Sequence, residues 1–182
     1  MTDPEGEHVH LTVDLTYPAS LDEVSAMLAD VRFVRWRSER AVRAGTPGGG
    51  TVERADVTGS ADHGFTVVVR RTLATDQIPA HARSFVGGAL EIRQAEAWEA
   101  ASDGRRVGTL SVEILGAPVR ITGTGRLQPL PDGGTRLTYD GDVRATVPLF
   151  GAVVEDAAVK AVRTALEEEG EAGRAWLAGE RP

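Results

Sequence analysis

Four polar side chains share the spacing of their apolar neighbours in this sequence: Arg71, Gln94, Glu96 and Tyr139. Each lies in a segment of alternating residues, in the phase of the apolar positions, so each should face the same side as those positions. A small-molecule site is typically an apolar pocket with a few placed polar groups. The four residues therefore predict a pocket that orients a ligand, in which Glu96 or Tyr139 could act as an acid or base.

This prediction depends on the register of the strands. A bulge would shift the phase by one residue and turn Gln94 and Glu96 toward solvent, because side chains alternate between the two faces of a strand. If Glu96 is buried, it needs a partner of opposite charge, and Arg71 is the candidate.

Period-two patterning indicates a sheet over most of the chain. Segment 8–16 alternates cleanly and predicts a half-buried strand. Six more segments read as strands: 51–58, 65–73, 89–100, 107–115, 118–130 and 135–147. Short turns such as Asp103-Gly104 separate several of them, which predicts an antiparallel meander.

Helical patterns occur before and after these six strands. Ser20 and Glu23 form a capping-box pattern that opens a short helix, and 31–40 predicts a second one that buries Phe33 and Trp36. The clearest helix follows Pro148. We expect its apolar stripe to hold Val154, Val162, Leu166 and the alanines Ala157, Ala161 and Ala165, and its other face to hold Glu155, Asp156, Lys160, Arg163, Glu167 and Glu168. Gly170 and Gly173 should weaken its last turns, although Trp176 and Leu177 should still dock.

Small residues are predicted on both sides of the space between sheet and helix. Gly123, Gly125 and Gly141 share the inward phase of the last two strands, opposite the helix alanines. They indicate either a cavity or a close approach of helix and sheet, with glycines that let the sheet bend. The long segment 74–88 is either a lid over a pocket mouth or an ordinary loop with Phe85 anchored in the core.

The element order resembles the helix-grip fold of the START-like superfamily, which includes birch-pollen-allergen type proteins and polyketide cyclases. The segments "YPASLDEVSAMLADVRFVRW" and "VPLFGAVVEDAAVKAV" look like the entry segment and the start of the grip helix. Residues from about Val9 to Leu177 resemble an actinobacterial family of unknown function within it, domain of unknown function 2505. The resemblance implies an α+β fold in which a curved antiparallel sheet of about seven strands wraps around a long C-terminal helix, with two short helices after the first strand.

The resemblance also implies a small apolar or amphipathic ligand, such as a lipid or polyketide, held between sheet and helix. It supplies no universal catalytic residue. The residues expected to line the site are Phe65, Val67, Val69, Arg71, Ile92, Gln94, Glu96, Trp98, Val112, Ile121, Gly123, Tyr139, Val154, Ala157 and Ala161. A binding protein or carrier is the first hypothesis. A cyclase or aromatase-like enzyme and a ligand-free protein-interaction domain are the alternatives.

Composition limits the remaining possibilities. The 182 residues fit a disordered tail, 1–7, followed by a single domain, 8–178, and the net charge of −7 argues against nucleic acid as a partner. The chain contains no cysteine, which excludes disulfides and thiolate chemistry. We expect no cofactor and no metal, because His8 and His10 share a strand face without a third ligand. No signal peptide and no membrane span is expected, so a cytoplasmic location follows. The oligomeric state stays open.

Overall fold

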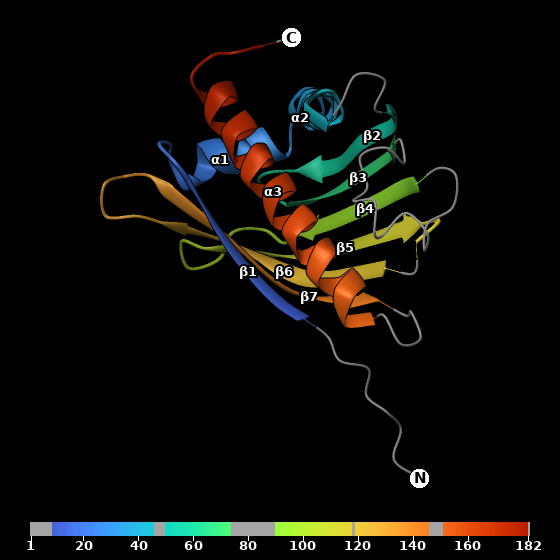
Figure 1. Cartoon of the computed structure of the whole chain (residues 1–182). Coiled ribbons are helices and arrows are strands. Elements are labelled where there is room, and N and C mark those ends of the chain that lie inside the picture. The colour runs from blue at the N-terminus through green and yellow to red at the C-terminus, as the bar shows by residue number, and fades with distance from the viewer. Residues whose placement is uncertain (1–8, 46–49, 74–89, 118, 146–150, 182) are drawn as a thin grey trace.

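The computed structural model describes residues 9–45, 50–73, 90–117, 119–145 and 151–181 (Figure 1). In chain order the elements are β1 (Val9–Tyr17), α1 (Leu21–Leu28), α2 (Val31–Gly45), β2 (Thr51–Ser60), β3 (Gly64–Leu73), β4 (Leu90–Trp98), β5 (Arg106–Leu115), β6 (Val119–Pro129), β7 (Thr135–Ala145) and α3 (Gly151–Leu177). The tail 1–7, Pro148 and the segment 74–88 lie outside the described residues.

The seven strands form one antiparallel sheet in the order β1-β7-β6-β5-β4-β3-β2. Consecutive strands from β2 to β7 pair with one another, and β1 joins the far edge beside β7. Figure 1 shows the sheet curving around α3, with α1 and α2 near one end of that helix. The α+β helix-grip architecture expected from the sequence is confirmed.

The register of the sheet follows the predicted alternation. In β4, Gln94 and Glu96 are buried in the same phase as Ile92 and Trp98, while the residues between them are exposed or half-buried. A register shift does occur, but it lies between Val52 and Arg54 in β2. The predicted inward residues of β3 to β7 therefore all face the concave side of the sheet.

The two short helices form where the sequence predicts them. The capping box at α1 is present: Glu23 N–H donates to Ser20 Oγ at 3.3 Å, and Ser20 N–H donates to Glu23 Oε2 at 2.9 Å. Helix α2 is longer than expected and continues to Gly45. It buries Phe33 as predicted and leaves Trp36 half-buried.

Helix α3 is unbroken through Gly170 and Gly173, so the expected weakness there is wrong. Both glycines face β1, where a Cβ would come 2.9 Å from Leu15 Cδ2 at Gly170 and 2.5 Å from Tyr17 Cε1 at Gly173. The helix can lie this close to β1 only because these positions lack side chains. The contact regained by close packing offsets the lower helix propensity of glycine, and Trp176 docks as predicted.

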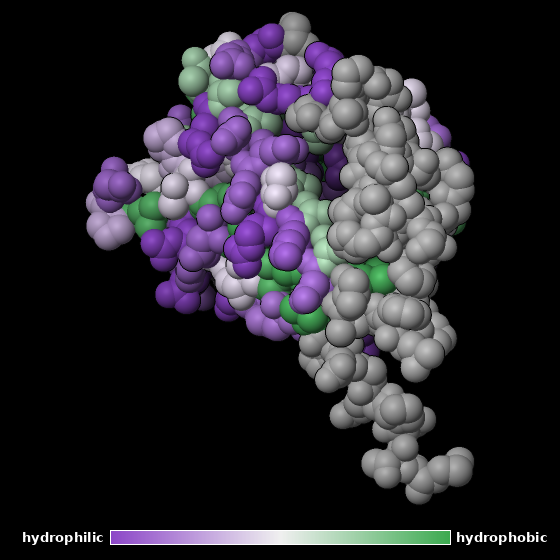
Figure 2. All heavy atoms as spheres, in the orientation of Figure 1, coloured by the Kyte–Doolittle hydropathy of each residue, from purple (hydrophilic) through white to green (hydrophobic). Residues whose placement is uncertain are grey.

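The buried stripe of α3 differs from the predicted one. Val154 and Leu166 are buried and Val162 is half-buried, but Ala161 is exposed and Ala157 only half-buried. Alanine has little apolar surface to bury, so the larger residues set the rotation of the helix. Hydrophilic residues accordingly prevail on the outer side of this region in Figure 2.

Candidate functional site

A buried carboxylate stands at the centre of the concave face. Glu96 is 1% exposed and accepts three hydrogen bonds: from Arg37 Nη2 at 2.9 Å and Gln94 Nε2 at 2.8 Å on Oε1, and from Trp98 Nε1 at 2.9 Å on Oε2. Gln94, Glu96 and Trp98 are alternate residues of β4, so the strand itself brings the three side chains to one face. Bonds to an ionised acceptor are short and strong, and they fix the carboxylate in one orientation.

The charged partner of Glu96 is Arg37, and the expected pairing with Arg71 is wrong. Arg37 is 4% exposed, and its Nη1 also donates to Glu169 of α3 at 3.1 Å. The guanidinium lies 5.6 Å from the ring centroid of Phe33, one helical turn earlier in α2. One residue of α2 thus joins β4 to α3 through a buried ion pair with Glu96 and a partly buried one with Glu169.

Arg37 and Glu169 are not among the site residues that the sequence predicts. A signal for Arg37 exists: it occurs in the apolar stripe of α2, four residues after Phe33 and three after Val34, where solvent-facing residues are not expected. Glu169 belongs to an acidic run that reads as a solvated helix face. Glu155, also expected in solvent, is buried and accepts a hydrogen bond from Ala145 N–H at 2.9 Å, which ties the start of α3 to the end of β7.

Trp98 takes up space that two glycines leave free. A Cβ at Gly108 would lie 2.7 Å from Cδ2 of the indole, and one at Gly125 would lie 3.0 Å from Cζ2. The ring also stacks on Phe65, with centroids 6.2 Å apart. Three of the predicted site residues, Phe65, Val67 and Val69, are fully packed in the core and line no open space.

Arg71 lies on the concave face without a counter-ion among the described residues. Its Nε is buried and has no hydrogen-bond partner, and the side chain as a whole is half-buried. Burial lowers the pKa of Arg71, an effect that Glu169 opposes and Arg37 reinforces. Arg71 therefore lies near the Arg37 cluster without being bonded to it.

Both tyrosines of the chain are buried near this cluster. Burial raises the pKa of Tyr139 well above its ordinary value, and the negative charge of Glu96 raises it further. Burial likewise raises the pKa of Tyr17. Each phenol keeps its proton at neutral pH, so Tyr139 is unsuited to act as a base there.

The inward side of β5 is less covered than the inward sides of its neighbours β4 and β6. Helix α3 packs chiefly on β1 and β7, and α2 packs on β2 and β3. Along β4, α2 contributes the bond from Arg37 to Glu96, and beside β5 the side chains of Val162 and Leu166 of α3 line one small void together with Leu110. The inward side chains of β5, Leu110, Val112 and Ile114, are half-buried, whereas Val67 and Val143 on the flanking strands are 0% exposed. We call this half-buried strip of the concave face along β5, with Gln94 and Glu96 of β4 beside it, the trough.

The glycines predicted to leave space form part of a packed region instead. Gly123 and Gly141 are register partners, and a Cβ on Gly141 would lie 2.6 Å from the carbonyl oxygen of Thr122 and 2.9 Å from Gly123 Cα. Val162 and Leu166 of α3 cover them and leave a void of about 20 Å³. Of the two interpretations, close approach with a bent sheet describes this pair.

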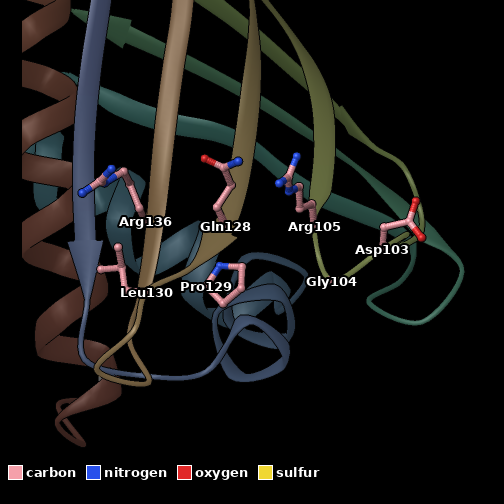
Figure 3. Close-up of a pocket in the computed structure, with 7 residues that line it drawn as sticks. All are labelled: Asp103, Gly104, Arg105, Gln128, Pro129, Leu130 and Arg136. Carbon is pink, nitrogen blue, oxygen red and sulfur yellow. The ribbon is translucent and has the colours of Figure 1, made fainter.

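A larger hollow of about 350 Å³ lies at one end of the sheet, outside the concave face (Figure 3). Its lining consists of Asp103, Gly104, Arg105, Gln128, Pro129, Leu130 and Arg136. These residues are exposed or half-buried, and Figure 3 shows Gln128 on β6 and Arg136 on β7, with Arg105 just before the start of β5. An open polar hollow of this kind has none of the sealed, oriented polar groups found on the concave face.

His10 makes surface contacts with acidic neighbours. Its Nδ1 lies 3.2 Å from Asp142 Oδ1 and its Nε2 lies 3.3 Å from Asp140 Oδ2. The hydrogen bond with Asp142 and the charge of Asp140 raise the pKa of His10. No cluster of three or more potential metal ligands occurs in the described part of the chain. Nor does any described helix have the length and apolarity needed to cross a membrane.

Solved structures of other proteins share this architecture. Norcoclaurine synthase from Thalictrum flavum, in complex with dopamine and hydroxybenzaldehyde, superposes with a TM-score of 0.55 at 11% identity, covering 97% of this chain and 90% of that one. The Zhui aromatase/cyclase from Streptomyces gives 0.50 at 15% identity, over 92% and 90% of the two chains. At these identities the likeness concerns the fold, which is the START-like helix-grip fold.

Within that class, the chain belongs to the family described as "Protein of unknown function (DUF2505)", which matches residues 12–177. Uncharacterized proteins Rv0481c of Mycobacterium tuberculosis and Mb0491c of Mycobacterium bovis are each 28% identical over 143 residues, which is 76% of this chain and 79% of theirs. The expected relationship to an actinobacterial family of unknown function is confirmed.

Proposed function

We propose that the protein binds a small apolar or amphipathic molecule in the trough and acts as a binding protein or carrier. The observation that carries this proposal is the half-buried state of Leu110, Val112 and Ile114 in the middle strand of a seven-stranded sheet. Apolar side chains at such a position are normally sealed, because burial stabilises them by about 25 cal/mol per Å². A ligand lying on them would gain the same contribution.

The surroundings of the trough supply orientation as well as burial. Gln94 and Glu96 stand in β4 beside Val112 and Leu110 of β5, their direct register partners. Toward β6 the apolar surface continues through Val119 and Ile121, and Val159 and Val162 of α3 pack against these. Of the predicted lining residues, Gln94, Glu96, Val112 and Ile121 support this proposal. Gly123, which is covered by α3, and Ala161, which is exposed, contribute less than expected.

A cyclase or aromatase-like reaction finds less support in the same geometry. General acid–base catalysis needs a group that can exchange a proton with the substrate. Glu96 already accepts three hydrogen bonds, one of them from a buried guanidinium, and Tyr139 holds its proton tightly. We therefore assign Glu96 a positioning role: it holds Arg37, Gln94 and Trp98 in place around the trough.

We also propose that 8–178 is a single folding unit that works in the cytoplasm and does not bind nucleic acid. The net charge of −7 supports the last point, since phosphate binding rests on clustered cations. Unfolding in denaturant should then be one cooperative transition with coincident probes. Fractionation of the host cell would test the location.

The binding proposal is tested with two matched substitutions. Val112→Trp fills the trough. Ser111→Trp places the same side chain one residue earlier in β5, where it points to the exposed convex face of the sheet. Wild-type protein purified from its own host is examined by native mass spectrometry and organic extraction, and both variants follow. We expect a bound apolar compound in the wild type and in Ser111→Trp, and none in Val112→Trp.

If native mass spectrometry finds no bound compound in any of the three proteins, thermal stability is measured next. Lipid and polyketide probes that bind the native state raise its melting temperature. If no probe raises the melting temperature of the wild type, the ligand-free interaction domain replaces our proposal. Equal occupancy of wild type and Val112→Trp would place the ligand elsewhere on the protein.

A further inference from the structure

Arg71 differs from its sequence neighbour in how its charge is met. Arg70 points to the convex face, where its Nε lies 2.8 Å from Glu53 and 2.8 Å from Glu91. Arg71 points to the concave face, and within the described residues its guanidinium has no ion pair and no hydrogen bond. Water and two carboxylates together stabilise the charge of Arg70. The Nε of Arg71 is buried, and the rest of its side chain has only partial access to water.

None of the described carboxylates forms an ion pair with Arg71. Glu96 and Glu169 both bond to Arg37, at 2.9 Å and 3.1 Å. Glu168 is half-buried on α3, where burial raises the pKa of its carboxyl group, and the described structure gives it no ion pair with Arg71. A buried charge is normally paired, so a guanidinium without a direct partner among the described residues leaves its donors available to a bound ligand.

The position of Arg71 fits the head of an elongated ligand. It pairs in register with Ile92 of β4, which pairs with Ile114 of β5, which pairs with Val119 of β6. One charged group thus stands at the end of an apolar row that crosses the trough. A guanidinium offers parallel N–H donors that match the two oxygens of a carboxylate.

We propose that the ligand of the trough is an amphipathic anion, an apolar body with one oxyanion head group, and that this head group pairs with Arg71. The inference rests on the proposed binding function and narrows its ligand class. A carboxylate suits the site best, because one planar group of single charge matches one free guanidinium. A phosphate monoester shares the oxyanion chemistry and is distinguished by experiment.

The test compares head groups on one apolar chain. Calorimetry with the full-length protein measures the affinities for dodecanoate, dodecyl phosphate, dodecanol and dodecylamine, with Arg71→Gln and Arg70→Gln as matched variants. A hydrogen-bonded charge pair contributes at least about tenfold in affinity. We expect wild type and Arg70→Gln to bind dodecanoate at least about tenfold more tightly than dodecanol, and Arg71→Gln to bind the two equally.

The outcomes separate the two proposals. If the wild type binds dodecanol as tightly as dodecanoate, or if Arg71→Gln keeps the preference, the anion inference is wrong while the apolar trough stands. If no compound binds the wild type, both proposals fail for this ligand class. A preference for dodecyl phosphate that is lost in Arg71→Gln keeps the oxyanion and corrects its identity.

A second measurement needs no ligand. Replacing an unpaired buried charge by an apolar side chain of similar length removes a desolvation cost, so Arg71→Met should raise the melting temperature of the ligand-free protein. A guanidinium that served the fold would give the opposite result, a lower melting temperature. That lowering would overturn the inference even where Arg71→Gln expresses poorly.

Discussion

Arg37 Nη2 of helix α2 lies 2.9 Å from Glu96 Oε1 of strand β4, and both side chains are almost completely buried. The pair connects a helix at the margin of the sheet to the centre of its concave face. Through Glu169 the same guanidinium also reaches α3. Arg37 therefore links α2, the sheet and α3 beside the trough.

Glu96→Ala should destabilise the protein by about 3–5 kcal/mol, because it leaves the buried Arg37 with one carboxylate in place of two and removes the acceptor of Gln94 and Trp98. The free energy of unfolding in denaturant measures this effect. Arg40→Ala is the control: Arg40 lies on the same helix, is exposed and faces Glu180 at 3.6 Å, so its loss should cost no more than about 1 kcal/mol.

The double variant Glu96→Leu with Arg37→Met forms a double-mutant cycle when Glu96→Leu and Arg37→Met are also measured singly. Replacing both members of a buried ion pair by apolar residues is commonly close to neutral, so the double variant should be more stable than Glu96→Ala. If the two single effects simply add, the residues are not coupled and the pair does not organise the site.

Gly125→Ala should cost about 1–3 kcal/mol, because the new methyl group would overlap the indole of Trp98. Trp98 fluorescence should also change, since the ring must move and its hydrogen bond to Glu96 must stretch. Thr124→Ala, at the exposed neighbouring position, is the matched control and should leave both signals nearly unchanged. A neutral Gly125→Ala would mean that the ring has other room.

Tyrosine ionisation should be suppressed in the folded protein. The chain has two tyrosines, and burial raises the pKa of both above the ordinary value of 10.0. A raised pKa in the folded state contributes stability that is fully present below pH 10 and is lost as pH rises above it, since only the unfolded phenols then release protons.

Near-ultraviolet absorbance against pH, recorded with circular dichroism, checks this prediction. Tyrosinate absorbance should appear only together with loss of structure, and with half the amplitude in Tyr139→Phe. A tyrosine that titrates near pH 10 in the folded protein would show that its phenol reaches solvent.

The periodic features of the fold could be predicted from the sequence. Alternation in β4 places Gln94 and Glu96 on the face of Ile92, and the Ser20–Glu23 spacing opens α1, because both patterns depend only on residues close in the chain. The same local rule predicts seven strands, a long closing helix and the concave face to which Arg71 belongs.

Which side chains pair with one another on that face could not be predicted, because it depends on how distant elements pack together. Arg37 and Arg71 are both arginines near apolar residues, and only the packing of α2 on the sheet decides that the first pairs with Glu96 while the second pairs with no carboxylate of the described residues. The rotation of α3, which buries Glu155 and exposes Ala161, follows from large residues docking on β1 and β7. Local sequence therefore determined which face each residue occupies, and tertiary structure decided its partner, because partners come from elements far apart in the chain.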